Sequence, residues 1–219
     1  MAFRILPLLL LVAVSTHAQN WSVGAGAGPF VFGDFVERTL LIESGESSDT
    51  QTLRLSAATS PGFTADLERR LSDRFAVRLE GTFTRSPLEV RGDDSDGVTL
   101  DAGEIDVTTF ALPIVYTINR RGSFRFRVAA GPAYASYRIE RDDDDASTIR
   151  VFTGTRSAWG LSLGGGVSWH WSERFSLEGK LTDVATASPF RREDFPALNR
   201  IRIERPHNIH TSAGIRYRF

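Results

Sequence analysis

Apolar residues alternate with polar or very small residues over several long stretches of this 219-residue sequence. In the clearest stretch, 158–171, one parity is large and apolar: Trp159, Leu161, Leu163, Val167, Trp169 and Trp171. Successive side chains of a β-strand point to opposite faces, so a period of two predicts strands with one apolar face. The same alternation returns at 208–219, and no stretch shows comparable helical periodicity. We therefore expect an all-β fold.

Turn-forming residues divide the alternating stretches into eight predicted strands, near 20–32, 51–70, 74–90, 103–118, 122–140, 148–171, 174–187 and 200–219. The connections alternate strictly in length. Three are short, at 71–73, 119–122 and 172–173, and four are long and polar, at 33–50, 91–102, 141–147 and 188–199. Short turns at one end and long loops at the other are typical of an eight-stranded antiparallel up-and-down transmembrane β-barrel, with both termini in the periplasm.

The first eighteen residues differ from the rest of the chain. Arg4 supplies a positive charge, residues 5–14 form an apolar run, and Ala18 is a small residue. This order is typical of a cleavable secretory signal peptide, and the apolar run is shorter than the roughly 20 residues of a membrane-spanning helix. We expect a signal peptide at 1–18 and one outer-membrane β-barrel domain at 19–219. The sequence has no cysteine, which excludes disulfide bonds.

Alternation alone fits a membrane barrel and also a soluble barrel that buries its apolar face. The aromatic residues favour the membrane, because many of them lie beside the short turns or at the chain end: Phe75, Tyr116, Phe124, Trp169, Trp171, Phe175, Tyr217 and Phe219. Aromatic rings gather at one level where a barrel meets the lipid headgroups. We therefore predict that these residues form an aromatic girdle. The alternative is a soluble periplasmic lipid-binding barrel.

Charged residues occupy the opposite parity at mid-strand and are predicted to face the barrel interior: Asp66, Glu68, Arg78, Glu80, Arg125, Arg127, Glu178, Lys180 and Arg216. The interior of an eight-stranded barrel is just wide enough for side chains to fill. Isolated charges there would be very costly, so these residues are expected to form a paired network. A small conducting pore is the alternative.

The predicted signal peptide, the rhythm of eight strands and the ending Gly214-Ile215-Arg216-Tyr217-Arg218-Phe219 resemble the small outer-membrane barrel family that includes OmpA and the OmpX/Ail group. The resemblance implies an integral outer-membrane protein surrounded by lipid and lipopolysaccharide. It also implies that the barrel-assembly machinery reads Tyr217 and Phe219 as its signal.

Two features are predicted on the side of the long loops. Ile201 and Ile203 share parity with Ile209, so the last strand is expected to continue through Pro206 above the membrane, where exposed strand edges can recruit other chains. Five arginines are candidates for contact with lipopolysaccharide phosphates: Arg191, Arg192, Arg200, Arg202 and Arg205. A solvated loop with ordinary ion pairs is the alternative interpretation.

The one pattern that suggests catalysis is His210-Thr211-Ser212, because small barrels that deacylate lipid A use a His-x-Ser pair. Alternation places His210 and Ser212 on the interior face, whereas a lipid hydrolase needs its nucleophile toward the acyl chains. We therefore predict no enzymatic activity, with a lipid A deacylase as an alternative. No cofactor, metal spacing or nucleic-acid motif is recognisable. The expected role is structural, in envelope integrity, or in surface interaction of the adhesion type, with an unidentified ligand or partner.

Overall fold

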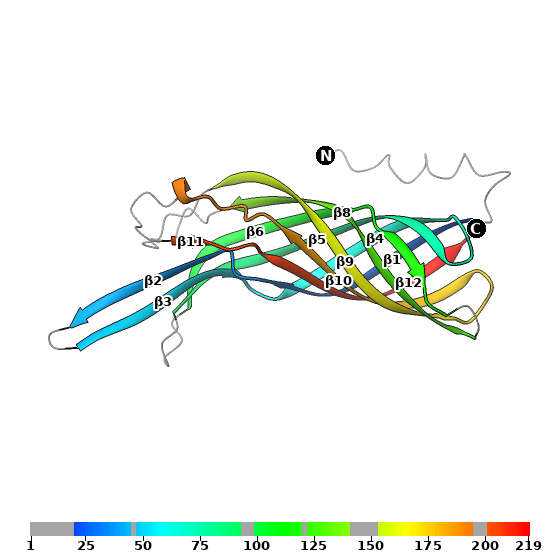
Figure 1. Ribbon diagram of the computed structural model, residues 1–219, viewed down its shortest axis with the longest axis horizontal. Coiled ribbons are helices and arrows are strands. Elements are labelled where there is room, and N and C mark those ends of the chain that lie inside the picture. Colours follow the sequence, from blue (N-terminus) through cyan, green and yellow to red (C-terminus); the bar gives the residue numbers. More distant parts are fainter. Residues whose placement is uncertain (1–19, 45–46, 93–98, 120–121, 141–152, 195–200) are drawn as a thin grey trace.

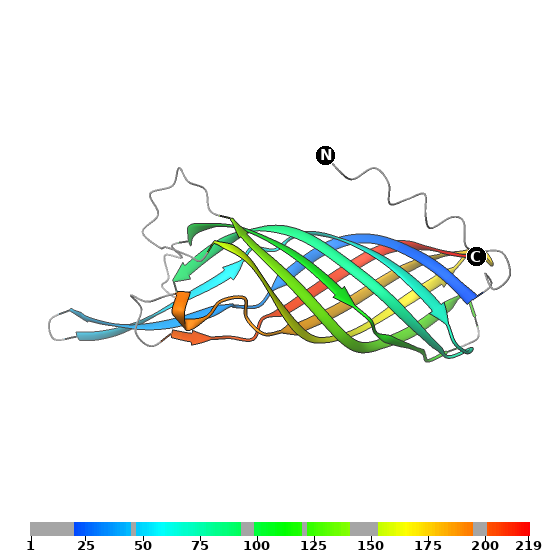
Figure 2. The same cartoon turned by 90° about the horizontal axis from the view of Figure 1, so that it is seen from above.

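The computed structural model describes residues 20–44, 47–92, 99–119, 122–140, 153–194 and 201–219. They form a closed antiparallel β-barrel with a sheet projecting from one end (Figures 1 and 2). In this part of the chain no helix is long and apolar enough to span a membrane. The predicted signal peptide lies outside the described residues, and its cleavage stays a prediction.

The barrel wall has eight positions, as the sequence predicts. They are β1 (Trp21–Phe32), β4 (Ser60–Arg70), β5 (Phe75–Gly92), β6 (Thr99–Ala111) continued by β7 (Ile114–Thr117), β8 (Phe124–Glu140), β9 (Gly154–His170), β10 (Phe175–Thr186) and β12 (His207–Arg218). Each pairs with its neighbour in chain order, and β1 pairs with β12 to close the barrel. The short turns at 71–73 and 172–173 and the chain end at Phe219 lie at one end, which we call the turn rim (Figure 1).

At the opposite end the structure corrects the predicted loop at 33–50. This segment contains β2 (Val36–Ser44) and the start of β3 (Ser47–Ala57), which form a hairpin. The base of β3 pairs with the far end of β5, and β11 (Ile201–Ile203) pairs with β2. The hairpin projects beyond the barrel in both views (Figures 1 and 2). We call β2, β3 and β11 the extension.

Besides the strand predicted at 103–118, which is divided into β6 and β7 at residues 112–113, two predicted continuous strands are interrupted. The strand predicted at 51–70 is divided into β3 and β4 at residues 58–59. The strand predicted at 200–219 does not continue through Pro206, because β11 ends at Ile203 and β12 begins at His207. Proline has no backbone N–H to donate to a strand ladder, which accounts for this second break. The projecting strands are therefore mainly those of the β2–β3 hairpin.

The membrane-facing part of the barrel has its apolar side chains outside and its polar side chains inside. Trp159 is 75% exposed, whereas Glu80 is 5% exposed. Other large exposed residues are Phe63, Leu79, Phe83, Phe110, Leu161 and Leu163. A soluble barrel would bury these side chains, whereas a barrel in lipid presents them to the acyl chains. The soluble lipid-binding alternative therefore conflicts with the structure.

The polarity reverses toward the extension. Along β5 the buried positions change from Arg78 and Glu80 to Leu88 and Val90, while the exposed positions change from Phe83 to Arg85. Above this change the barrel has an apolar interior like that of a soluble protein. We call this interior the outer core; it includes Phe30, Phe32, Phe35, Leu88, Val90, Ile105, Val107, Tyr137, Ile139 and Phe190. The reversal marks the level at which the strands leave the hydrocarbon.

Candidate functional site

Eight charged side chains fill the barrel interior between the turn rim and the outer core. We call them the charge cluster: Asp66, Glu68, Arg78, Glu80, Arg127, Glu178, Lys180 and Arg216. All are charged residues of the inward parity on β4, β5, β8, β10 and β12, and none of their side chains is more than 13% exposed. The cluster contains four cations and four carboxylates, so its formal charges balance.

Arg216 on β12 links strands on both sides of it, β10 and β4. Its Nε donates to Glu178 Oε1 at 2.7 Å, and its Nη2 donates to Asp66 Oδ1 at 2.5 Å. A third donor, Nη1, reaches Ser22 Oγ at 3.0 Å. Glu178 also accepts a hydrogen bond from Arg127 Nη1 at 2.9 Å. Strands that are distant in sequence, β4, β8, β10 and β12, are thereby joined across the interior.

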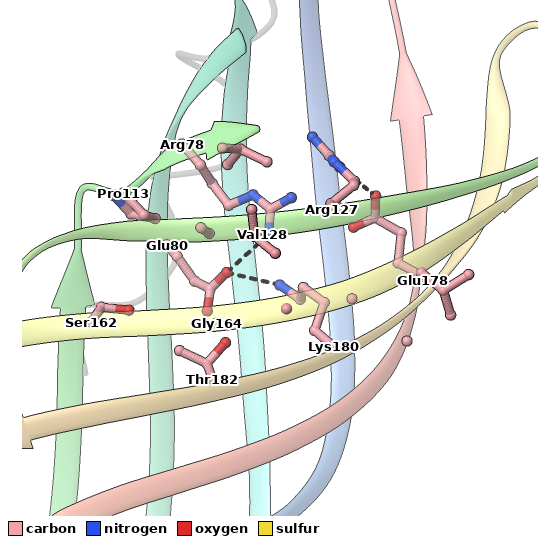
Figure 3. Close-up of a pocket in the computed structure, with 16 residues that line it drawn as sticks. Arg78, Glu80, Pro113, Arg127, Val128, Ser162, Gly164, Glu178, Lys180 and Thr182 are labelled. Atoms are coloured by element: carbon pink, nitrogen blue, oxygen red, sulfur yellow. Dashed lines mark hydrogen bonds and ion pairs between the residues drawn. The ribbon is translucent and has the colours of Figure 1, made fainter. Parts of the chain in front are cut away.

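The second half of the charge cluster is organised by Arg78 and Lys180. Arg78 Nη2 donates to Glu68 Oε2 at 2.8 Å, and Arg78 Nη1 lies 3.4 Å from Glu80 Oε2. Lys180 Nζ lies 2.9 Å from Glu80 Oε2 (Figure 3). It also lies 3.1 Å from Asp66 Oδ2. Each carboxylate in the cluster therefore contacts at least two cations, because Glu68 is paired with Arg127 as well. Such multiple pairing offsets the desolvation of buried charge.

The structure brings together eight of the nine charged residues predicted for the interior. Arg125 is the exception: it lies at the turn rim and forms no ion pair with any described residue. It lies two positions before Arg127 on β8, so both have the same parity. Parity gives the face of a side chain, but the strand register decides its partners.

The eight predicted girdle residues lie around the turn rim, and neighbouring rings are in contact. Ring centroids are 5.2 Å apart for Phe75 and Tyr116 and 6.3 Å apart for Phe124 and Trp169. A continuous series then joins Trp169, Trp171, Phe175, Tyr217 and Phe219, with separations from 5.0 to 6.2 Å. Their interaction with lipid headgroups stays a prediction.

A second set of outward-facing aromatic residues was missed in the sequence. Phe110 is directly opposite Tyr134 in the register of β6 and β8, and Tyr134 is opposite Trp159 in that of β8 and β9. The rings of Tyr134 and Trp159 are 5.2 Å apart. This set lies near the polarity reversal, where a second interfacial level belongs. In the sequence these three aromatic residues have the same outward parity as many other apolar residues. The alternating pattern therefore did not identify them as a group.

The His210-Thr211-Ser212 pattern lies inside the barrel, as predicted. His210 and Ser212 are both buried, and the ring of His210 stacks on Phe30 with centroids 5.6 Å apart. No hydrogen bond between His210 and Ser212 is found in the described structure. The pair is thus separated from the lipid by the barrel wall. Among the described residues no group of three or more His, Cys, Asp or Glu side chains could hold a metal ion.

The candidate lipopolysaccharide contacts lie on the exposed surface near the extension, except Arg200, which lies outside the described residues. Arg192 and Arg205 are exposed. Arg202 Nε is 2.7 Å from Glu204, and Arg191 Nη1 is 3.4 Å from Glu193. Contact of these arginines with phosphate stays a prediction.

A short segment at 188–194 covers the outer core. Phe190 is buried in that core, and Arg156 Nη2 donates to Asp194 Oδ1 at 2.6 Å. Arg156 Nη1 also donates to the backbone oxygen of Pro189 at 2.9 Å. Partial burial would raise the pKa of Asp194, but hydrogen bonds from Arg156 and from the Arg191 backbone N–H outweigh it and lower the pKa below 3.8. The sequence predicted only a polar loop here.

The family model described as "Outer membrane protein beta-barrel domain" matches residues 5–219. Comparison with curated protein sequences gives no significant match. Among solved structures, OprG from Pseudomonas aeruginosa is similar with a TM-score of 0.57 and 15% identity, over 92% of this chain and 96% of that chain. Neisserial surface protein A gives 0.54 and 12%, over 91% and 97%. At sequence identities this low, the structural similarity shows a common fold alone.

Because Glu178 pairs with two buried arginines, we expect the free energy of unfolding to depend strongly on it. The Glu178→Gln variant should leave Arg216 and Arg127 short of a buried counter-charge and lower the free energy of unfolding by about 3–5 kcal/mol. The measurement is urea unfolding of the barrel in lipid vesicles. Glu173→Gln, the same change in an exposed turn, is the control and should shift stability by no more than about 0.5 kcal/mol. Equal shifts in the two variants would contradict the assignment.

The segment at 188–194 should be held less firmly in acid. Because the pKa of folded Asp194 is lowered, its contribution is present above the ordinary value of 3.8 and is lost as pH falls through the folded pKa. The expected result is loss of amide-exchange protection at Arg191 in acid, and at neutral pH in Asp194→Asn. Glu193→Gln, an exposed neighbour, should keep the protection. Unchanged protection in Asp194→Asn would count against this contact.

Proposed function

This chain belongs to the family of outer membrane protein β-barrel domains and is an integral outer-membrane protein, and from that premise we propose a closed, non-catalytic barrel that presents an interaction surface outside the cell. The observation that carries the proposal is the filled interior. The charge cluster occupies its middle, and the outer core and residues 188–194 occupy the end toward the extension. A molecule with no open lumen has to act through its ends or its outer face.

The extension is the part suited to bind other chains. In the described residues, β2 pairs with β11 only at Val36–Arg38, and β3 pairs with β5 only from Leu53 onward. The remainder of each strand has one edge without a neighbouring described strand. Unpaired backbone N–H and C=O groups at such edges can add a strand from a partner. We propose a surface-interaction role of the adhesion type through these edges.

The absence of catalysis is part of the same proposal. His210 and Ser212 are buried inside the barrel, and the wall separates them from acyl chains. Lipid and lipopolysaccharide surround the barrel. We propose that four arginines contact the phosphate groups of lipopolysaccharide: Arg191, Arg192, Arg202 and Arg205. We also propose that the barrel-assembly machinery recognises the Tyr217 and Phe219 end.

Orientation can be tested with single cysteines, because the sequence has none. Arg54 lies on the extension with 46% of its side chain exposed, and Glu173 lies in an exposed turn of the turn rim. A membrane-impermeant maleimide should label Arg54→Cys on intact cells and should label Glu173→Cys only after the outer membrane is permeabilised. The reverse pattern would overturn the proposed orientation.

The surface role can be tested by shortening the hairpin. Thr39 and Thr52 are directly paired, so replacing residues 40–51 with Asn-Gly should close a two-residue turn and preserve the barrel. Cells displaying the intact chain should adhere to fibronectin-coated or collagen-coated wells more than cells displaying the shortened chain. Heat-modifiable gel mobility checks that both chains are folded. Equal adhesion on both surfaces would contradict the adhesion role assigned to the hairpin.

A further inference from the structure

The turn-rim mouth of the barrel carries an excess of positive charge that the charge cluster does not explain. A cavity of about 60 Å³ lies there, and its lining adds four arginines to the cluster: Arg70, Arg74, Arg125 and Arg218. The only carboxylate in this lining that is not part of the charge cluster is Asp73. Because the cluster is balanced, four added cations and one added carboxylate leave a formal excess of three positive charges.

None of these four arginines forms an ion pair with a carboxylate of the described residues. Arg74 Nη1 donates to the Tyr116 hydroxyl at 2.9 Å, and Arg70 Nη2 lies 3.4 Å from Asn20 Oδ1. The side chains of Arg125 and Arg218 form no hydrogen bond or ion pair with the described residues. Arg125 and Arg218 instead repel each other, and both are repelled by Arg70. An anion in the mouth would relieve this repulsion.

Buried polar atoms without partners lie beside these arginines. They are Arg125 Nε, Ser168 Oγ and His170 Nδ1. Arg125 is directly opposite Ser168 in the register of β8 and β9, and His170 follows two residues later on the same face. Buried polar atoms in native proteins nearly always have a partner, because leaving one unsatisfied is costly. Their convergence on one cavity points to a bound polar group.

We propose that this mouth is a binding site for a tetrahedral oxyanion of the phosphate class. Guanidinium groups bind phosphate through paired N–H donors, and the serine and histidine supply further polar atoms from another direction. A tetrahedral anion can satisfy donors from several directions, whereas a planar carboxylate has only two oxygens. The cavity has room for a few water-sized molecules, which is the size of a phosphate group.

The phosphate can come from a free anion or from the headgroup of a phospholipid in the leaflet at this rim. This site is separate from the extension and from the binding role proposed for it. It adds a ligand site at the opposite end of the molecule. Loss of phosphate binding and loss of adhesion would therefore be independent results.

The test is a titration of the full folded barrel in octyl glucoside, a detergent without phosphate. Inorganic phosphate is added against chloride at constant ionic strength, and the Nε–H resonance of Arg125 is followed by NMR. A saturable shift with phosphate alone is expected. Arg218→Gln should weaken apparent binding about tenfold or more, since a hydrogen bond to a charged group contributes about 1.5–3 kcal/mol.

Arg69→Gln is the matched control, because Arg69 neighbours Arg70 but does not line the cavity. Its guanidinium lies over the Trp21 ring, 5.5 Å from the ring centroid. It should bind phosphate like the unmodified chain. If Arg218→Gln does not fold, Ser168→Ala replaces it and should also weaken binding. Equal responses to phosphate and chloride, or equal affinities in the unmodified chain and the mouth variant, would overturn the proposal.

A second arm distinguishes the two sources of phosphate. The barrel is placed in nanodiscs of phosphatidylcholine or of phosphatidylglycerol. A lipid headgroup in the mouth should shift the Arg125 resonance without added phosphate, and inorganic phosphate should then cause little further change. A free anion should shift it equally in both lipids, and only on addition. No shift in any nanodisc would contradict the site.

Discussion

The pairing of Arg216 with Asp66 and Glu178 is the interaction on which the rest of the structure depends. These groups lie in a narrow interior surrounded by lipid, where an unpaired charge would be very unfavourable. Satisfying Arg216 requires carboxylates from β4 and β10 at the same level as β12. The pairing therefore fixes the relative positions of β4, β10 and β12, and we propose that it closes the lumen. Once the lumen is closed, specific function has to lie at the two ends.

The second constraint is that each strand passes through two surroundings. In β5 the outward residues are apolar up to Phe83, and the inward residues become apolar from Leu88 onward. The first part suits lipid outside and a polar cluster inside, and the second suits water outside and an apolar core inside. One continuous strand can do both, because alternation is kept while the polarity of the two faces is exchanged. The base of the extension therefore packs into the outer core, which is separate from the charge cluster.

Much of the barrel could be predicted from the sequence, since lipid requires strong alternation. The stretch around Trp159 and Leu161 gives one strand directly, and short turns give the rhythm of eight. The β2–β3 hairpin was missed because strands in water need no large apolar outer face, and residues such as Glu37, Arg38 and Thr39 resemble a polar loop. The charge partners could not be predicted because they depend on register across the barrel. Arg125 shows this, since it shares parity with Arg127 but lies apart from the cluster.

The closed interior is the central claim, and conductance across a planar lipid bilayer tests it most directly. The purified, folded barrel should insert without producing stable single-channel current steps, because the charge cluster and the outer core fill the path between its ends. Insertion can be verified separately by heat-modifiable mobility of protein recovered from the same lipid. Reproducible ohmic current steps from the unmodified chain would contradict a lumen closed by paired charges.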